Sequence, residues 1–216
     1  MFDLVVGKKA FVPSRVFCIG RNYMAHAQEL GNAVPSEPIV FMKPAQSLLP
    51  VGEKIIVSDE WGRLEYEAEI VLLIGKAGKN IKKEDAMYYI EGITLGLDLT
   101  LRELQKKLKE KGLPWERAKS FEKSAPIGKF IPVDKGFSLS NIQFSCKING
   151  ELRQNGNSKD MLFSIPKLVE AVSKWWKLLP GDLIFTGTPS GVGSLERGDI
   201  AELSNLRIGH FSWKRG

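Results

Sequence analysis

Three carboxylates in two short stretches of the chain have the residue type and spacing of a metal site. The stretch "EYEAEIVLLIGK" places Glu67 and Glu69 two positions apart, directly before the apolar run 70–74. On an extended strand such side chains share a face and lie about 6.6 Å apart, so both carboxylates can reach one cation. Burying an uncompensated carboxylate is costly, and a bound cation would offset that cost. A water-exposed face is the alternative, which we prefer for Glu65 near the start of the strand.

Asp98 is the third carboxylate of this set. It lies in "GITLGLDLT", where apolar residues at 93, 95, 97 and 99 alternate with small or polar ones. Asp98 is on the polar side and precedes a predicted helix, whose N-terminus attracts anions. It could serve as a local cap, but Thr100 already offers one. Three carboxylate ligands without a Cys or His cluster favour a hard cation, Mg²⁺ or Mn²⁺, over zinc.

Histidine is scarce, and one of the two histidines has a carboxylate at helical spacing. His26 and Glu29 are three residues apart, so they are neighbours on one face of a predicted helix. A carboxylate that orients an imidazole is the arrangement of a general base. A surface ion pair is the alternative. His210, near the C-terminus, is predicted to lie on an edge strand.

Short strands and helices must position these residues. "VFCIG" predicts a strand that ends at Gly20, and Asn22 is the expected cap of a helix that runs to Leu30 and ends at Gly31. "PIVFMKP" predicts a further strand, and "AMYYIEGITLGLDLT" predicts a helical turn that leads into another.

The helix after Asp98 is expected to begin at Leu101. Thr100 and Glu103 match a capping box, and the predicted inner stripe is Leu101, Leu104 and Leu108.

In the second half, the pair 149–150 (Asn-Gly) predicts a two-residue turn between strands. Ser164, with Pro166 in the first turn, predicts a helix to about Leu179, and "PGDLIFTGTPSGVG" predicts a strand and a glycine-rich loop.

Length and composition indicate one α+β domain. The 216 residues, 43% hydrophobic, suffice for one sizeable core, so we expect a single domain over 1–216. Many short strands with three or four helices, and no regular βαβ alternation, favour the α+β class. Because no signal peptide and no apolar run of about 18 residues is present, we expect a soluble cytoplasmic protein without a membrane partner. Cys18 and Cys146 are expected to be buried and unpaired by any disulfide.

The formal net charge of +6 raises nucleic acid as a partner. The densest basic run is interleaved with Leu104 and Leu108 at helical spacing, which predicts a solvated helix face; its members are Lys106, Lys107, Lys109 and Lys111. No basic stripe with aromatics or reader motif is visible, and small anionic substrates explain the charge as well. A basic nucleic-acid-binding domain remains the non-enzyme alternative, although we expect no nucleic-acid partner. "TGTPSGVGS" has no lysine after its glycines and so is no phosphate-binding P-loop.

Seven motifs in order resemble the fumarylacetoacetate hydrolase family: "GRNYMAHAQE", "SEPIVFMKP", "EYEAEIVLLIGK", "GLDLTLRELQ", "GLPWERAKSF", "NGELRQ" and "FTGTPSGVG". The likeness is closest to its short single-domain branch of acylpyruvate hydrolases and oxaloacetate decarboxylases, and it extends from about residue 14 to the C-terminus. It implies a mixed β-strand roll, of the type found in the family's C-terminal domain, with a few short helices.

The resemblance also implies residue roles. Glu67, Glu69 and Asp98 match the Mg²⁺ ligands, and His26 with Glu29 matches a catalytic dyad on a helix that closes over the site in relatives. Lys119 matches the catalytic lysine; the substrate-contacting positions are Arg21, Arg102, Gln105 and Thr188. Structural alternatives stay open for these last residues: Arg102 as a solvated helix residue, Thr188 as a turn residue before Pro189, and Gln105 as a half-buried neighbour of the leucine stripe.

The implied activity is that of a Mg²⁺-dependent, or Mn²⁺-dependent, hydrolase or lyase acting on a small anionic 2-oxo acid. It would cleave the carbon–carbon bond of 2,4-dioxo acids (acylpyruvates) or decarboxylate oxaloacetate, through the enolate of pyruvate. An isomerase, hydratase or decarboxylase of aromatic meta-cleavage pathways, of the 5-carboxymethyl-2-hydroxymuconate type, and an oxaloacetate tautomerase are alternatives within the family. Relatives are mostly homodimers, so a homodimer is expected.

Overall fold

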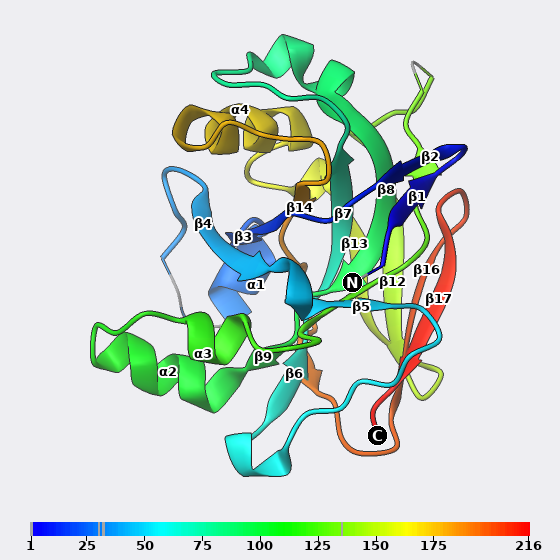
Figure 1. Cartoon of the computed structure of the whole chain (residues 1–216). Coiled ribbons are helices and arrows are strands. Elements are labelled where there is room, and N and C mark those ends of the chain that lie inside the picture. Colours follow the sequence, from blue (N-terminus) through cyan, green and yellow to red (C-terminus); the bar gives the residue numbers. More distant parts are fainter. Residues whose placement is uncertain (1, 30, 32, 135) are drawn as a thin grey trace.

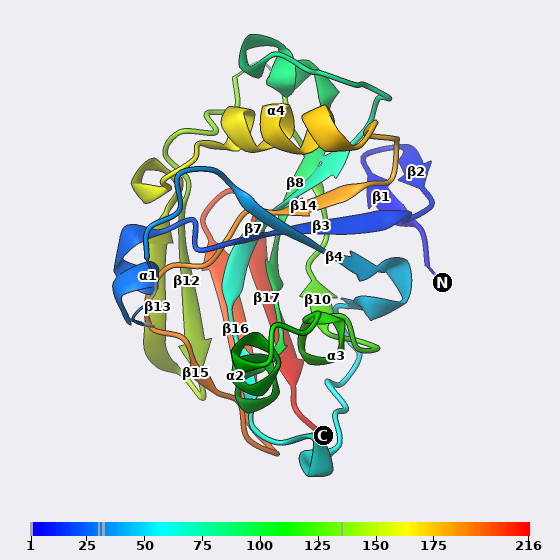
Figure 2. The ribbon, with the colours of Figure 1, turned by 90° about the vertical axis from the view of Figure 1, so that its left-hand side faces the viewer.

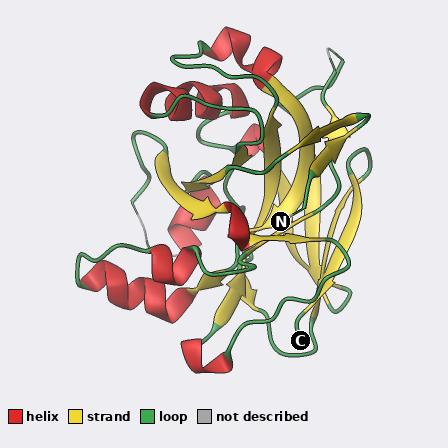
Figure 3. Cartoon of the chain, viewed as in Figure 1, coloured by secondary structure: helices red, strands yellow, loops and turns green. Residues whose placement is uncertain are grey.

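Strands dominate the molecule, and the helices are short (Figure 3). The structure is a computed structural model that describes residues 2–29, 31, 33–134 and 136–216. Its strands pair both parallel and antiparallel, so the prediction of an α+β protein built on a mixed β roll is confirmed.

A large mixed sheet forms the centre of the fold (Figures 1 and 2). Its strands in spatial order are β4 (Ile39–Pro44), β3 (Arg15–Gly20), β14 (Leu183–Phe185), β7 (Ala68–Ile74), β8 (Ile90–Leu97), β10 (Ala125–Ile127) and β5 (Leu48–Pro50), with β11 (Ile131–Pro132) also beside β8. β14 runs parallel to β3 and β5 parallel to β10, whereas β7 and β8 are antiparallel. Every residue of β7 is buried, which explains its nearly continuous apolar sequence.

A second, antiparallel sheet packs its apolar side into the same core. Its strands in order are β13 (Glu151–Asn157), β12 (Gln143–Ile148), β16 (Ile200–Asn205) and β17 (Gly209–Lys214). Phe144 and Trp213 from this sheet belong to one buried cluster with Leu72 of β7. The predicted turn at 149–150 is confirmed by positive φ angles of 53° and 82°. His210 lies on the edge strand β17, as predicted.

Smaller elements surround the two sheets. The remaining strands are β1 (Leu4–Val6) paired with β2 (Lys9–Phe11), and the three-stranded set β15 (Gly193–Ser194), β6 (Leu64–Tyr66) and β9 (Thr100–Leu101). The α-helices are α1 (Met24–Glu29), α2 (Arg102–Glu110), α3 (Glu116–Lys119) and α4 (Ile165–Trp175), and the 3₁₀ turns are η1 (Ala45–Ser47), η2 (Asp59–Trp61), η3 (Lys83–Tyr89) and η4 (Ser158–Asp160). α4 lies at one end of the molecule, and α2 and α3 lie at the other (Figures 1 and 2). Among the described residues, no helix has the length and apolar character needed to cross a membrane.

Asn22 does not cap α1, so that prediction is wrong. The helix begins at Met24, and the buried Asn22 amide donates to the carbonyl oxygens of Phe163 (3.0 Å) and Thr186 (2.8 Å). Asn22 therefore ties the start of α1 to distant segments of the chain. The predicted last helical residue, Leu30, lies outside the described residues. Gly31 has a φ of 62° and follows the helix as the predicted terminator.

The prediction of a capping box at the start of α2 is also wrong. Thr100 and Leu101 form β9, the helix begins at Arg102, and no side chain caps it. The Thr100 hydroxyl is used inside the site, where it accepts a hydrogen bond from Lys119 Nζ (2.6 Å). The predicted leucine stripe faces inward: Leu101 and Leu108 are buried, and Leu104 is half-buried.

α4 starts after Ser164 with Pro166 in its first turn, as predicted, but it ends at Trp175 and not near Leu179. Trp176 is extended, and the Leu178 N–H then donates to the Gly78 carbonyl (2.7 Å). This long-range backbone pairing replaces the last helical turn.

Candidate active site

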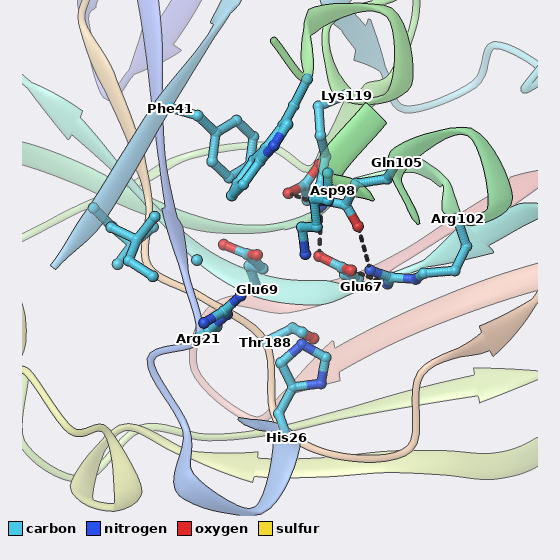
Figure 4. Close-up of a pocket in the computed structure, with 15 residues that line it drawn as sticks. Arg21, His26, Phe41, Glu67, Glu69, Asp98, Arg102, Gln105, Lys119 and Thr188 are labelled. Atoms are coloured by element: carbon cyan, nitrogen blue, oxygen red, sulfur yellow. Dashed lines mark hydrogen bonds and ion pairs between the residues drawn. The ribbon is translucent and has the colours of Figure 1, made fainter. Parts of the chain in front are cut away.

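One pocket lies between the large sheet and helices α1, α2 and α3 (Figure 4). All predicted site residues except Glu29 line it: Arg21, His26, Glu67, Glu69, Asp98, Arg102, Gln105, Lys119 and Thr188. Its remaining walls are largely apolar and come from Ile19, Ile39, Phe41 and Trp115, together with Gly20 and Lys109.

Antiparallel pairing of β7 and β8 brings the three acidic residues together. Glu67 lies in the break between β6 and β7, Glu69 is on β7, and Asp98 directly follows β8. The Asp98 N–H donates to the Glu67 carbonyl (2.8 Å), which holds the backbones of the two residues side by side. One carboxylate oxygen from each residue lies within 4.8 Å of the others, and all three residues are buried.

This acidic triad, Glu67, Glu69 and Asp98, could hold a divalent metal ion. Asp98 Oδ1 is buried without a hydrogen bond; Lys43 Nζ lies 2.9 Å away as an ion pair without hydrogen-bond geometry. Burial, followed by repulsion from Asp98 and Glu67, raises the pKa of Glu69 well above its usual range. A bound cation would relieve both the unsatisfied Asp98 oxygen and the repulsion between the carboxylates. Hard oxygen donors are the ligands that Mg²⁺ and Mn²⁺ prefer.

Gly187 supplies a further contact to the triad. Its N–H donates to Glu69 Oε2 (2.7 Å), and its φ of 98° suits glycine. A Cβ atom here would lie 2.6 Å from the Asn22 Cβ, so the close approach of the two segments requires glycine.

Lys119 is buried among the acidic groups at the end of α3. Its Nζ donates to Glu67 Oε2 (2.9 Å) and Asp98 Oδ2 (2.8 Å). Burial would lower the pKa of Lys119, but the two carboxylates raise it above its usual value. Burial would likewise raise the pKa of Glu67, yet Lys119 and Arg102 hold it well below its usual range. Lys119 therefore stays cationic beside ionised Glu67.

Arg102, at the start of α2, is an ion-pairing residue of the pocket. Its guanidinium donates to Glu67 and to Gln105 Oε1 (2.8 Å) (Figure 4). It also donates to Glu65 Oε2 (2.7 Å). Burial opposes the charge of Arg102, but Glu67 and Glu65 raise its pKa above the usual value. The expectation of a water-exposed Glu65 is wrong, because this residue is 5% exposed and paired with Arg102. Gln105 is more buried than expected, at 4% exposed.

His26 faces the triad from the opposite side of the pocket (Figure 4). Its Nδ1 lies 3.4 Å from Glu29 Oε2. Glu29 also accepts a hydrogen bond from the Gly191 N–H (3.0 Å), so the carboxylate links α1 to the loop after β14. A Cβ at Gly191 would lie 2.0 Å from the Arg153 carbonyl oxygen, so this loop position requires glycine.

Thr188 and Arg21 also line the pocket. The Thr188 hydroxyl donates to the Ala68 carbonyl (2.8 Å) and accepts from the Gln154 amide (2.8 Å), so it is more than a turn residue. Arg21 has a φ of 57°, a left-handed conformation that is uncommon for a non-glycine residue. Such strain is often found at functional sites.

Sequence reasoning missed two lysines at the site. Lys43 of β4 is buried, ion-paired with Asp98, and donates to the carbonyl oxygens of Leu99 (3.2 Å), Lys119 and Ser124 (3.1 Å). A lone lysine in a strand gives no signal for this. The assignment of Lys109 to a solvated helix face is wrong, because it is half-buried and lines the pocket. Lys109 follows Gln105 by four residues, a spacing that places both on one helical face and could have predicted that Lys109 lies at the site.

Comparisons with known proteins show the family of the chain. The family described as fumarylacetoacetate (FAA) hydrolase C-terminal matches residues 15–212. An oxaloacetate decarboxylase, mitochondrial, of Dictyostelium discoideum is 42% identical over 187 residues, which cover 86% of each chain. An oxaloacetate tautomerase, mitochondrial, of Bos taurus is 42% identical over 184 residues, which cover 85% of this chain and 83% of the relative.

A solved structure is similar over nearly its whole length. It is the fumarylpyruvate hydrolase of Pseudomonas aeruginosa in complex with Mn²⁺ and pyruvate, with a TM-score of 0.93, 37% identity, and coverage of 99% of this chain and 95% of that one. The chain belongs to the fumarylacetoacetate hydrolase family. The resemblance predicted from its motifs, and the prediction of an enzyme, are confirmed.

Proposed function

We propose that this protein is a Mg²⁺- or Mn²⁺-dependent enzyme that cleaves acylpyruvates, or decarboxylates oxaloacetate, through the enolate of pyruvate. The observation that carries the proposal is the buried acidic triad beside Lys119, facing His26 across one pocket. Relatives named as an oxaloacetate decarboxylase and as a fumarylpyruvate hydrolase with Mn²⁺ and pyruvate support it. We infer that the described chain works as one catalytic domain.

The head of the substrate would bind at the triad. Held by Glu67, Glu69 and Asp98, a divalent cation would supply Lewis-acid stabilisation of the negative charge that develops on the 2-oxo oxygen. Lys119 would add a fixed positive charge at the same end, because its pKa stays high among the carboxylates. Arg102 would keep Glu67 ionised and hold Gln105 toward the substrate.

His26 would act on the other end of the scissile bond. In hydrolysis it would take a proton from the attacking water, while Glu29 holds the imidazole in place through Nδ1. The hydrogen bond from Gly191 to Glu29 would keep α1 closed over the substrate and exclude bulk water. Thr188 and Arg21 would contact the bound substrate. Decarboxylation needs no water, so it would depend on His26 only for closure or proton delivery.

Oxaloacetate tautomerisation is a second candidate, favoured by the similarity to the bovine tautomerase. It breaks the C3–H bond and forms an O–H bond on the 2-oxo oxygen, or the reverse, and it cleaves no carbon–carbon bond, so the same triad and His26 would suffice. We also expect a homodimer and a cytoplasmic location, which light scattering of the purified protein and cell fractionation would test.

A screen of acetylpyruvate, fumarylpyruvate and oxaloacetate tests the proposal. Pyruvate release and the ultraviolet absorbance of the enol should be followed together, with Mg²⁺ or Mn²⁺ and after removal of metal by a chelator. We expect metal-dependent pyruvate release from at least one compound, and an absorbance change without pyruvate would identify the tautomerase. Equal turnover with and without metal would reject the proposal.

A further inference from the structure

The cations that line the pocket are of two kinds. Arg102 and Lys119 are ion-paired with carboxylates of the site. Within the ranges that the structure describes, Arg21 and Lys109 form no ion pair with any carboxylate, although both line the pocket. The charges of the acidic residues and of the cations paired with them nearly cancel. A divalent metal ion, together with Arg21 and Lys109, would therefore give the pocket a strongly positive net charge.

Lys109 is directed to the pocket by its place on α2. It is four residues beyond Gln105 and seven beyond Arg102, so the three share one helical face. Its Nζ lies 4.9 Å from the centre of the Trp115 ring, which holds the ammonium over the indole face. Lys106 on the same helix is exposed, so Lys109 is distinguished from that neighbour by position and not by residue type.

The surroundings of Lys109 favour an anionic ligand. Burial, followed by repulsion from Arg21, Arg102 and Lys119, lowers the pKa of Lys109 to about 8. An anion placed between Arg21 and Lys109 would be attracted by both cations and would offset their mutual repulsion. The apolar wall of Phe41 and Trp115 would keep water away and strengthen the attraction.

We propose that Lys109, together with Arg21, binds a second carboxylate of the substrate, so that the enzyme selects 2-oxo acids with a negatively charged tail. This inference rests on the proposed function. Lys109 makes no hydrogen bond or ion pair with the acidic triad among the described residues, so it serves a group other than the one held there. Its role is to set specificity; it takes no part in bond cleavage.

A charge-removing variant tests the subsite with two substrates that undergo the same hydrolysis. Fumarylpyruvate carries a tail carboxylate, and acetylpyruvate ends in a methyl group. We expect Lys109→Met to lower the ratio of kcat/KM for fumarylpyruvate over acetylpyruvate about tenfold to hundredfold, mainly through the KM of fumarylpyruvate. Lys109→Arg should retain most of the ratio. Lys106→Met removes the same charge from the same helix and should leave the ratio unchanged.

Each contrary result has a definite meaning. Equal losses of kcat/KM on both substrates would assign Lys109 a structural role and overturn the inference. Unchanged kcat/KM values for both substrates would also overturn it. A loss in Lys106→Met equal to that in Lys109→Met would reduce the effect to long-range attraction, and the subsite would be rejected. Metal-independent turnover, or no turnover of any compound by the wild-type enzyme, would instead reject the proposed function.

Binding of a matched ligand pair tests the subsite without turnover. 2-Oxoglutarate and 2-oxopentanoate have the same chain length and differ in a terminal carboxylate or methyl group. With Mg²⁺ present, calorimetry should show tighter binding of 2-oxoglutarate to the wild-type protein, and Lys109→Met should remove most of that preference. Equal affinities in the wild-type protein would overturn the inference.

Discussion

The two ends of the pocket differ in how their charges are satisfied. At the strand end, Glu67, Glu69 and Asp98 are buried; Glu67 and Asp98 pair with Lys119, and Glu69 accepts a hydrogen bond from the Gly187 N–H. At the helix end, Arg21 and Lys109 line the pocket and have no carboxylate partner in the described part of the chain. The two ends therefore suit different tasks, since paired groups keep a fixed geometry and unpaired ones attract a ligand.

In the proposed function, this difference separates the residues that assist the reaction from those that select the substrate. The strand end is built from adjacent strands of a buried sheet, which holds its side chains rigidly for a reacting group. The helix end is formed by the segment leading into α1 and by one face of α2, where substitutions can change the substrate without disturbing the sheet. Substitutions at each end should accordingly have different signatures.

Loss of a triad carboxylate should have the largest effect. Asp98→Ala or Glu69→Ala removes an oxygen donor from the cation site, and we expect metal-dependent turnover to fall about a thousandfold or more. Circular dichroism should show an intact fold. Glu202→Ala, which removes a carboxylate of β16 that does not line the pocket, is the matched control. Full activity of either triad variant would show that the strand end has no catalytic task.

Lys43→Met should destabilise the protein. The substitution leaves buried Asp98 with one ion-pair partner, Lys119, where it had two, and leaves three carbonyl oxygens without this donor, so we expect a loss of about 3 kcal/mol in the free energy of unfolding. Urea denaturation measures it, with Lys106→Met as the control. Added Mg²⁺ should restore part of the stability. A loss below about 1 kcal/mol would mean that the stability of the strand end does not depend on the ion pair between Lys43 and Asp98.

His26→Ala should separate the proposed reactions. Because water attack needs a base, we expect acylpyruvate hydrolysis to fall about a hundredfold, whereas oxaloacetate decarboxylation should fall much less. Pyruvate release from both substrates measures the split. Equal losses for the two reactions would reject the division of roles between water activation and enolate stabilisation.

The pH dependence should report on the helix end. Charged groups facing Lys109 are Arg21, Arg102, Lys119 and Glu67, and burial with these cations lowers its pKa to about 8. Lys109 is thus cationic below pH 8 and loses its charge above it. For fumarylpyruvate, kcat/KM should fall about tenfold from pH 7 to pH 9, with a much smaller change for acetylpyruvate. Lys109→Arg should shift the decline to higher pH; parallel profiles for both substrates would assign the titration to another group.

Local patterns predicted much of the fold. The strands at β3, β4, β7 and β8 and the turn at 149–150 follow from runs of apolar residues and from turn chemistry, which neighbouring residues determine. Asn22 and Thr100 were predicted wrongly because each side chain has a distant partner that competes with the local cap. The premature end of α4 has the same cause, since Leu178 pairs with Gly78.

The sequence by itself determined the residue types of the site: carboxylates beside core strands, and a histidine with a carboxylate at helical spacing. Only the tertiary structure decided which charges meet. Glu65 is paired and buried, Lys43 is ion-paired with Asp98, and Lys109 lines the pocket. Strand register and helix position set these distances, and electrostatic energy depends on distance and burial, which residue order alone does not contain.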